Sequence, residues 1–214
     1  MELSRDEIKN ENIRKTAKKL TDMMTSEEKI YQTLNSTPPI ERLGINGYDW
    51  WNEGLHGVAR AGLATVFPQA IGLAATWDET LAEQVADAVS TEARAKYNMQ
   101  QRMDDTGRYK GLTLWAPNIN IFRDPRWGRG HETYGEDPYL TSRMGIRFIE
   151  GLQGHDENYL KSAACVKHFA VHSGPEGLRH EFNAVVSKKD MYDTYLPAFK
   201  ACIQEAHVEA VMGA

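Results

Sequence analysis

The feature that most constrains the fold is a regular alternation of short apolar segments with longer amphipathic ones. The apolar segments are "GLTLWAP" (111–117), "SAACVKHFAV" (162–171) and "VEAVMG" (208–213). They are apolar on both faces, as strands buried in a parallel sheet are, and they start about fifty residues apart, which leaves room for a helix between strands. The sequence therefore predicts parallel βα units, as found in an α/β barrel or a doubly wound sheet.

The amphipathic segments have the apolar spacing of helices that bury one face. Thr76 and Glu79 have the pattern of a capping box ahead of the first helix, and Ser187 is the expected cap of the third, which Pro197 should kink. The expected buried residues are Leu81, Val85, Ala88, Val89 and Ala93 in the first helix, Leu140, Met144, Phe148, Ile149 and Leu152 in the second, and Met191, Tyr195, Phe199 and Ile203 in the third.

A barrel is favoured over a doubly wound sheet because no strand is followed by a glycine-rich phosphate loop. Residues 5–34 have a polar helical pattern in which Thr25 or Ser26 can cap a helix, so we expect residues 1–40 to be an N-terminal helical segment. A complete eight-unit barrel needs about 250 residues. We therefore expect an α/β fold of the (β/α)8 TIM-barrel type, incomplete in this chain, with residues 41–214 as its first part.

Charge and composition narrow the range of ligands. The net charge is −5 and the basic residues are dispersed, which argues against nucleic acid or an anionic membrane as a partner and favours a small neutral ligand. The charged N-terminus has no apolar signal-peptide core, so a cytoplasmic protein is expected. Cys165 and Cys202 lie in apolar segments and are expected to be packing residues, not a disulfide framework.

Lys167 and His168 lie at the end of a predicted strand, which is where functional side chains of a barrel gather. An ammonium beside an imidazole can hold adjacent hydroxyls of a sugar. A solvated strand end is the simpler alternative. A metal site would use His168 and His172 with Glu176 and His180 nearby, but histidines four residues apart face the same way only on a helix, and this segment leaves a strand.

Two further segments carry similar chemistry. Residues 118–138 form a long loop that contains three arginines, several acids, and Trp127 and Tyr134 as possible aromatic platforms. Residues 48–60 bring two tryptophans together with Glu53, His56 and Arg60. Aromatic faces and carboxylates suit sugar rings and their hydroxyls. In the first segment the alternative is that the arginines and acids pair only with one another. In the second it is that the tryptophans are buried in the core.

Four motifs resemble the N-terminal barrel domain of glycoside hydrolase family 3, in its β-xylosidase and β-glucosidase branch. They are "WNEGLHGVAR", "FPQAIGLAATWD", "PNINIFRDPRWGRGHETYGEDP" and "VKHFAVHSGPEGLRHEFN". The resemblance runs from about residue 20 to the C-terminus and implies no cofactor and no metal. The sugar-binding positions that it implies are Glu53, Arg60, Arg129, Lys167 and His168.

The resemblance also implies a retaining hydrolase whose nucleophile and acid/base lie outside this stretch of sequence. Asp124, Glu132 and Asp137 match the motif loop but do not align with the catalytic carboxylates, so no catalytic residue is assigned. We expect an exo-acting β-xylosidase, with a β-glucosidase as the alternative, that acts on a β-linked oligosaccharide or an aryl glycoside. A non-catalytic sugar-binding or interaction fragment is the rival class, and a metal-dependent hydrolase ranks third. Expected protein partners are the remainder of the enzyme or a second copy of the chain.

Overall fold

The computed structural model describes residues 5–214, which fall into one compact unit that ends at Asp49 and a second from Trp50 to Ala214. This division lies a few residues beyond the boundary at 40/41 expected from the sequence. No helix within residues 5–214 has the length and apolar character needed to cross a membrane.

The first unit contains two helices and a small antiparallel pair of strands. Its helices are α1 (Arg5–Met23) and α2 (Ser26–Tyr31), followed by the 3₁₀ turn Glu41–Leu43; β1 (Ser36–Thr37) pairs with β2 (Tyr48–Asp49). The polar helical pattern is interrupted at Thr25, whose hydroxyl accepts from the backbone of Glu28 while the Glu28 carboxylate accepts from the backbone of Thr25. This capping box starts a new helix, and of the two caps that the sequence offered, Thr25 or Ser26, it is Thr25 that serves.

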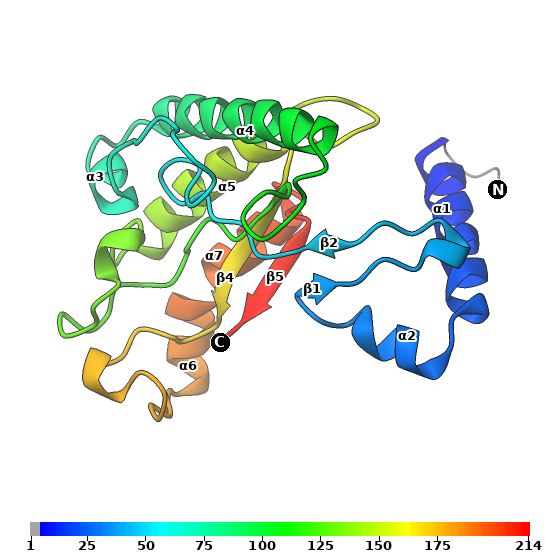
Figure 1. Cartoon of the computed structure of the whole chain (residues 1–214). Helices are drawn as coiled ribbons and strands as arrows, with labels where there is room; N and C mark the ends of the chain where they lie inside the picture. The colour runs from blue at the N-terminus through cyan, green and yellow to red at the C-terminus, as the bar shows by residue number, and fades with distance from the viewer. Residues whose placement is uncertain (1–4) are drawn as a thin grey trace. The chain divides into compact units, whose positions relative to one another are not determined.

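The second unit is built on a parallel sheet with the order β3-β4-β5, of which Figure 1 shows β4 and β5 side by side. Its strands are β3 (Thr113–Leu114), β4 (Ala163–Phe169) and β5 (Ala210–Gly213). A parallel bridge from Asn52 to Leu114 adds the segment after Trp51 on the other side of β3. Neighbouring strands therefore follow one another in the sequence, which is the arrangement of a (β/α) barrel and confirms the predicted parallel βα units.

Helices between these strands form the outer layer, with α4 and α5 side by side (Figure 1). The helices are α3 (Ala70–Ala74), α4 (Glu79–Arg102), α5 (Pro138–Gln153), α6 (Lys188–Asp190) and α7 (Pro197–Gln204). Short 3₁₀ turns lie at Gly130–Glu132 and Glu176–Leu178. The core between helices and sheet is formed by large, fully buried side chains, which include Leu114, Ile119, Met144, Phe148, Ile149 and Phe199.

The predicted capping box of α4 is wrong. The N-cap is Asp78, whose carboxylate accepts from the backbone N–H of Leu81 at 3.0 Å. The Thr76 hydroxyl instead donates to the carbonyl of Leu73. The helix starts later than predicted because Trp77 has a left-handed backbone, with φ of +58°, which a helix cannot include.

The third helix has the predicted cap and the predicted interruption. Ser187 accepts from the backbone N–H of Asp190, and a π-helical turn, Met191–Tyr195, precedes Pro197. Proline has no N–H to donate within a helix, which accounts for the break in regular pairing there. Cys165 and Cys202 are both buried free thiols, as expected of packing residues, and burial raises their pKa values to about 11 and about 12.

Candidate sugar-binding site

All five side chains that the sequence singled out line one pocket of about 490 Å³ in the second unit. Lys167 and His168 come from β4, Arg129 from the loop after β3, and Glu53 and Arg60 from the segment that bridges to β3. These positions lie at and after the C-terminal ends of parallel strands, where barrel enzymes place their functional groups. The fold therefore gathers residues that are more than a hundred positions apart in the chain.

Lys167 is only 3% exposed, so its ammonium is held in a largely desolvated position. Its Nζ atom lies 3.9 Å from Oε2 of Glu53. Burial lowers the pKa of Lys167, and the facing carboxylate of Glu53 offsets part of that effect. A buried cation with one distant ion partner has donor capacity left for hydroxyl oxygens.

Glu53 is oriented by the tryptophan two residues before it. The indole Nε1–H of Trp51 donates to Oε1 of Glu53 at 2.7 Å, which leaves Oε2 on the side of Lys167. The carboxylate therefore presents one oxygen to an indole and the other to the pocket. Such an oxygen can accept from a sugar hydroxyl.

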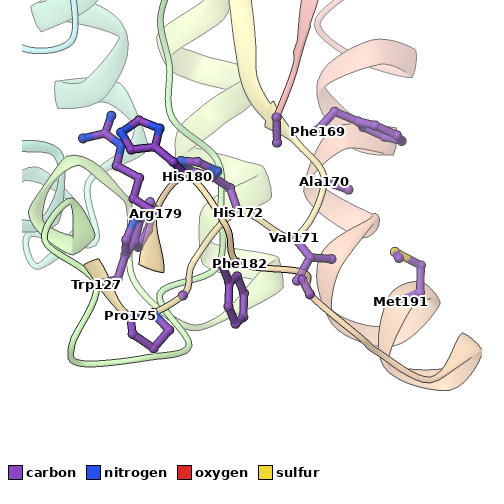
Figure 2. Close-up of a pocket in the computed structure, with 13 residues that line it drawn as sticks. Trp127, Phe169, Ala170, Val171, His172, Pro175, Arg179, His180, Phe182 and Met191 are labelled. Carbon is purple, nitrogen blue, oxygen red and sulfur yellow. The ribbon is translucent and has the colours of Figure 1, made fainter. Parts of the chain in front are cut away.

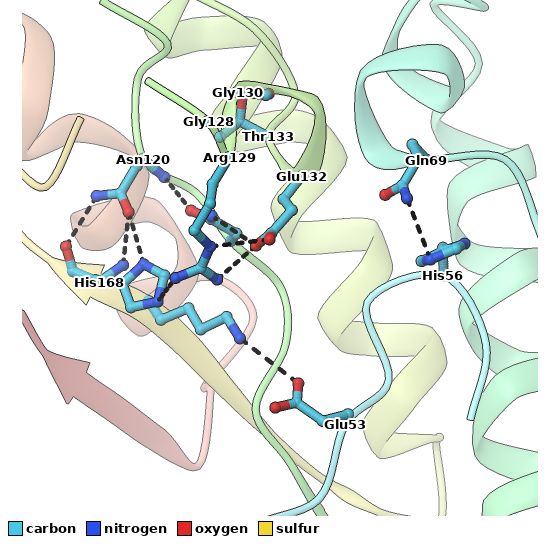
Figure 3. Close-up of polar contacts among 12 residues, drawn as sticks. Glu53, His56, Gln69, Asn120, Gly128, Arg129, Gly130, Glu132, Thr133 and His168 are labelled. Atoms are coloured by element: carbon cyan, nitrogen blue, oxygen red, sulfur yellow. Dashed lines mark hydrogen bonds and ion pairs between the residues drawn. The ribbon is translucent and has the colours of Figure 1, made fainter. Parts of the chain in front are cut away.

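The tautomer of His168 follows from its two partners. Its Nε2 atom lies 3.2 Å from Nη1 of Arg129, and because a guanidinium can only donate, Nε2 accepts (Figure 3). The proton is therefore on Nδ1, which lies 3.0 Å from Oδ1 of Asn120. The Asn120 amide nitrogen donates to the carbonyls of His168 and Ala170, which fixes the orientation of the amide.

The environment of His168 keeps its imidazole neutral. Burial, followed by the cationic groups of Arg129 and Lys167, lowers its pKa to about 2; His172 and Arg179 contribute in the same direction. Protonation would place a positive charge against a guanidinium and remove the acceptor that Arg129 uses. His168 therefore contributes a neutral, fixed ring to the pocket and does not act as a general acid near neutral pH.

This environment predicts a pH dependence of stability. Below the ordinary histidine pKa of 6.5 the unfolded chain binds a proton at His168 and the folded chain does not, so the free energy of unfolding falls as the pH falls. For one proton the slope is about 1.4 kcal/mol per pH unit. Urea denaturation between pH 4.5 and 6.5 should show a shallower slope for His168→Asn than for the unchanged chain. Equal slopes would mean that His168 is not buried beside these cations.

Arg129 is fixed by Glu132 in a two-point ion pair, with Nε–Oε1 at 2.8 Å and Nη2–Oε2 at 2.5 Å (Figure 3). Both side chains are 16% exposed. Burial acts to raise the pKa of Glu132, but the hydrogen bond and charge of Arg129, together with Lys167, outweigh it and lower the pKa overall. The guanidinium is thus held rigidly with its remaining nitrogen against His168.

Other charged residues of this loop pair locally and stabilise the loop, which is the alternative that the sequence left open. The Asp124 carboxylate accepts from the backbone and guanidinium of Arg126, which lowers its pKa to about 2. Asp137 is the N-cap of α5 and accepts from the backbone of Leu140. These acids are therefore committed to local structure, whereas Arg129 reaches the pocket.

The aromatic platforms proposed from the long loop lie elsewhere. Tyr134 is 2% exposed within the hydrophobic core, and Trp127, 4% exposed, lines a neighbouring pocket. The aromatic wall of the first, candidate pocket consists of Trp51 and Trp115, whose rings stack at 5.1 Å between centroids and 14° between planes. Trp50, the other candidate, is 46% exposed and does not line this pocket.

The pocket is also lined by residues that sequence reasoning did not assign to the site, among them Trp115, Arg179 and Met212. Trp115 and Met212 lie at the C-terminal ends of β3 and β5, so the strand-end rule could have identified both. Arg179 lies in the loop after β4 and had no such signal. His56 lines the pocket as well, but one of its ring nitrogens is bonded to the Gln69 amide (Figure 3) and the other to the Phe67 carbonyl.

A second pocket, of about 540 Å³, lies beside the first and shares Arg179 with it (Figure 2). Its lining combines the apolar side chains of Phe169, Val171, Phe182 and Met191 with His172, Arg179 and His180. Within residues 5–214, the buried Nε1 of Trp127 and Nε2 of His172 have no hydrogen-bond partner. The charged and hydroxyl-binding groups are therefore concentrated in the first pocket.

The geometry disfavours a metal ion at the histidines. The Nε2 atom of His168 faces the cationic Arg129, and the Glu176 carboxylate accepts from the backbone of Gly128. In the described part of the chain, no group of three or more histidine, cysteine, aspartate or glutamate side chains is arranged to hold a metal. The arrangement instead suits a neutral polyhydroxylated ligand.

Comparisons with known proteins show which family this stretch of sequence resembles. The family model described as "Glycosyl hydrolase family 3 N terminal domain" matches residues 17–214. A xylan 1,4-β-xylosidase of Xylanibacter ruminicola is 49% identical over 209 residues, which cover 95% of this chain and 24% of the relative. The probable β-D-xylosidase 7 of Arabidopsis thaliana is 43% identical and is matched over 94% of this chain and 28% of its own length.

Solved structures lead to the same group. A GH3 exo-β-xylosidase in complex with a xylobiose aziridine activity-based probe superposes with a TM-score of 0.80 at 35% identity, over 91% of this chain and 26% of that chain. A GH3 β-glucosidase of Bifidobacterium adolescentis superposes with a TM-score of 0.74 at 28% identity, over 90% and 26%. The chain thus spans about a quarter of the length of the proteins that it matches.

Proposed function

The chain belongs to glycoside hydrolase family 3, within its N-terminal domain, and from this premise we propose that it supplies the sugar-binding pocket of a longer β-xylosidase. The substrate is a β-linked xylo-oligosaccharide, from which the enzyme removes the terminal xylose at the non-reducing end. The observation that carries the proposal is the convergence of Glu53, Arg60, Arg129, Lys167 and His168 on one pocket beside two stacked tryptophans.

Each side of the pocket has a chemical task in this proposal. Lys167 donates to hydroxyl oxygens of the terminal sugar, and Oε2 of Glu53, which faces Lys167, accepts from a hydroxyl. Arg129 and His168 form a fixed wall that orients the ring. The Trp51 ring is already stacked on Trp115 and has the guanidinium carbon of Arg108 5.1 Å from its centroid, so we assign stacking on the sugar to Trp115.

The reaction itself needs two carboxyl groups that this pocket does not provide. A retaining glycosidase uses a nucleophile and an acid/base about 5–5.5 Å apart. Among the described residues that line the pocket, the carboxylates are Glu53 and Glu132, and both are held by neighbouring donors. We propose that the remainder of the enzyme supplies both catalytic groups.

Xyloside specificity is tested in the full-length enzyme with a pair of aryl substrates. We expect kcat/KM for 4-nitrophenyl β-xyloside to exceed that for the β-glucoside by about tenfold or more, since a single unsuitable substituent in a fitted pocket is worth about 1–3 kcal/mol. Equal values, or a preference for the glucoside, would favour the β-glucosidase alternative, which the structural match to β-glucosidases also supports. Sugar binding without hydrolysis of either substrate would favour the non-catalytic alternative.

The 214-residue chain alone is expected not to cleave either substrate above background. Binding groups without a free carboxylate nucleophile cannot form the glycosyl-enzyme intermediate. The measurement is release of 4-nitrophenolate by the purified chain, with the full-length enzyme as the positive control. Turnover by the chain at a rate near that of the full-length enzyme would show that one of the described carboxylates acts as the nucleophile.

A further inference from the structure

Tyr109 lies next to the sugar-binding pocket but does not line it. It belongs to the loop between α4 and β3, is half-buried, and lines a small cavity behind the pocket together with Glu53. Its φ angle is +69°, a left-handed conformation that a glycine would adopt without strain. A tyrosine in this conformation calls for an explanation in terms of what its side chain contacts.

The contacts of Tyr109 are with two residues that do line the pocket. Its backbone N–H donates to the carbonyl of Trp51 at 3.1 Å, and its ring meets the Trp51 indole edge-on, at 6.1 Å between centroids and 74° between planes. The guanidinium carbon of Arg60 lies 5.4 Å from the centroid of the same ring. Tyr109 therefore touches the pocket-lining tryptophan on one side and the pocket-lining arginine on another.

Arg60 itself depends on such support. It is exposed and has a left-handed backbone, with φ of +62°. A long, charged side chain at an exposed position has many rotamers available, and a ring beneath its guanidinium restricts them. The Tyr109 ring thus favours the orientation in which Arg60 lines the pocket.

The contact with Trp51 extends into the pocket. The Trp51 indole N–H holds one oxygen of Glu53, and the other oxygen of Glu53 faces Lys167. A tilt of the Trp51 ring would therefore displace the Glu53 carboxylate. Gly111 strengthens the same attachment, since its backbone N–H donates to Oδ1 of Asn52 at 2.6 Å.

We propose that Tyr109 is a positioning residue for this pocket: its ring holds Trp51 and Arg60 in place, and through Trp51 it sets the position of the Glu53 carboxylate. The role of these groups in sugar binding rests on the function proposed above. The positioning itself does not, so the two can be tested separately.

The left-handed backbone of Tyr109 allows its ring to be removed without adding backbone strain. Tyr109→Gly removes the ring and at the same time relieves the backbone, so the loop should fold without added strain. Tyr109→Phe keeps the ring and should behave like the unchanged protein. Asp104→Gly is the matched control, because Asp104 lies in the same loop and has φ of +55°.

The first measurement follows the Trp51 indole in the ¹⁵N-labelled 214-residue chain by NMR, with its signal assigned from the resonance lost in Trp51→Phe. We expect this N–H signal to shift and to exchange with solvent several times faster in Tyr109→Gly, and to stay unchanged in Tyr109→Phe and Asp104→Gly. An unaltered Trp51 signal in Tyr109→Gly would overturn the proposal, whatever the enzyme acts on. A change of the same size in Asp104→Gly would also overturn it, because general loosening of the loop would then be the cause.

The second measurement uses steady-state kinetics of the full-length enzyme on 4-nitrophenyl β-xyloside. Tyr109→Gly should raise KM by about five- to tenfold with kcat within about twofold, because contacts to the bound sugar weaken before and during reaction alike. Tyr109→Phe, which keeps the ring, should have the KM of the unsubstituted enzyme. A fall in melting temperature with KM unchanged would assign Tyr109 a purely structural role. If the unsubstituted enzyme does not act on xylosides but the Trp51 signal changes as expected, the proposed function is refuted. The positioning role of Tyr109 is then still supported.

Discussion

Replacing Lys167 with methionine is expected to lower kcat/KM for xylosides by about ten- to a hundredfold in the full-length enzyme. The substitution leaves a buried hydroxyl of the sugar without its donor, a loss that typically costs about 1–3 kcal/mol. Methionine keeps most of the volume, so the packing around this 3% exposed side chain should survive. Removal of a desolvated ammonium should also leave the melting temperature unchanged or slightly higher.

Two variants make the Lys167 result specific. Lys161→Met removes another lysine, one that is paired with Asp87 at the surface, and should leave kcat/KM unchanged. His172→Ala tests the metal hypothesis, which requires that histidine, whereas the sugar hypothesis does not. If Lys167→Met retains kcat/KM while His172→Ala and a chelator both abolish activity, Lys167 and His168 do not form a sugar-binding pair.

Gly151→Val is expected to destabilise the fold by about 3 kcal/mol, which for a chain of this size lowers the melting temperature by roughly 6–12 °C. Gly151 lies on α5 where that helix meets α4, and a Cβ atom there would be 2.3 Å from the Glu83 carbonyl oxygen and 2.9 Å from the backbone nitrogen of Asp87. Both are backbone atoms of α4, so the helices must separate. The bond from the Ser90 hydroxyl to the Gly151 carbonyl, at 2.9 Å, would break as they do, which leaves the hydroxyl only its bond to the Asp87 carbonyl.

Thermal and urea denaturation of the purified chain measure this effect. The matched control is Gly177→Val, where a Cβ atom would meet nothing within 4 Å. Gly151→Ala is a stricter test. Alanine forms helices better than glycine by about 1 kcal/mol, yet it should still destabilise the chain at this position. Equal stability of the two valine variants would mean that α4 and α5 do not pack as closely as described.

The sequence by itself determined the class of fold and identified five residues that line one pocket. Apolar segments at regular spacing are a property of the chain, and they predicted parallel strands at 111–117, 162–171 and 208–213 with helices between them. The four motifs are long enough to identify the family and, through it, Glu53 and Lys167 as pocket residues, which the structure indeed places 3.9 Å apart at their charged atoms. Caps that depend on neighbours in the sequence, at Thr25 and Ser187, were also predictable.

Only the tertiary structure decided which side chains form the aromatic wall and how the charged groups are held. Trp51 and Trp115 stack although they lie far apart in the chain, whereas Trp127 in the most conspicuous motif is buried beside another pocket. The tautomer of His168 depends on Arg129, and the support given by Tyr109 depends on a left-handed backbone. The physical reason is that apolar and charged patterns report local periodicity, whereas the partner of each side chain is set by strands and loops that meet only after the sheet has formed.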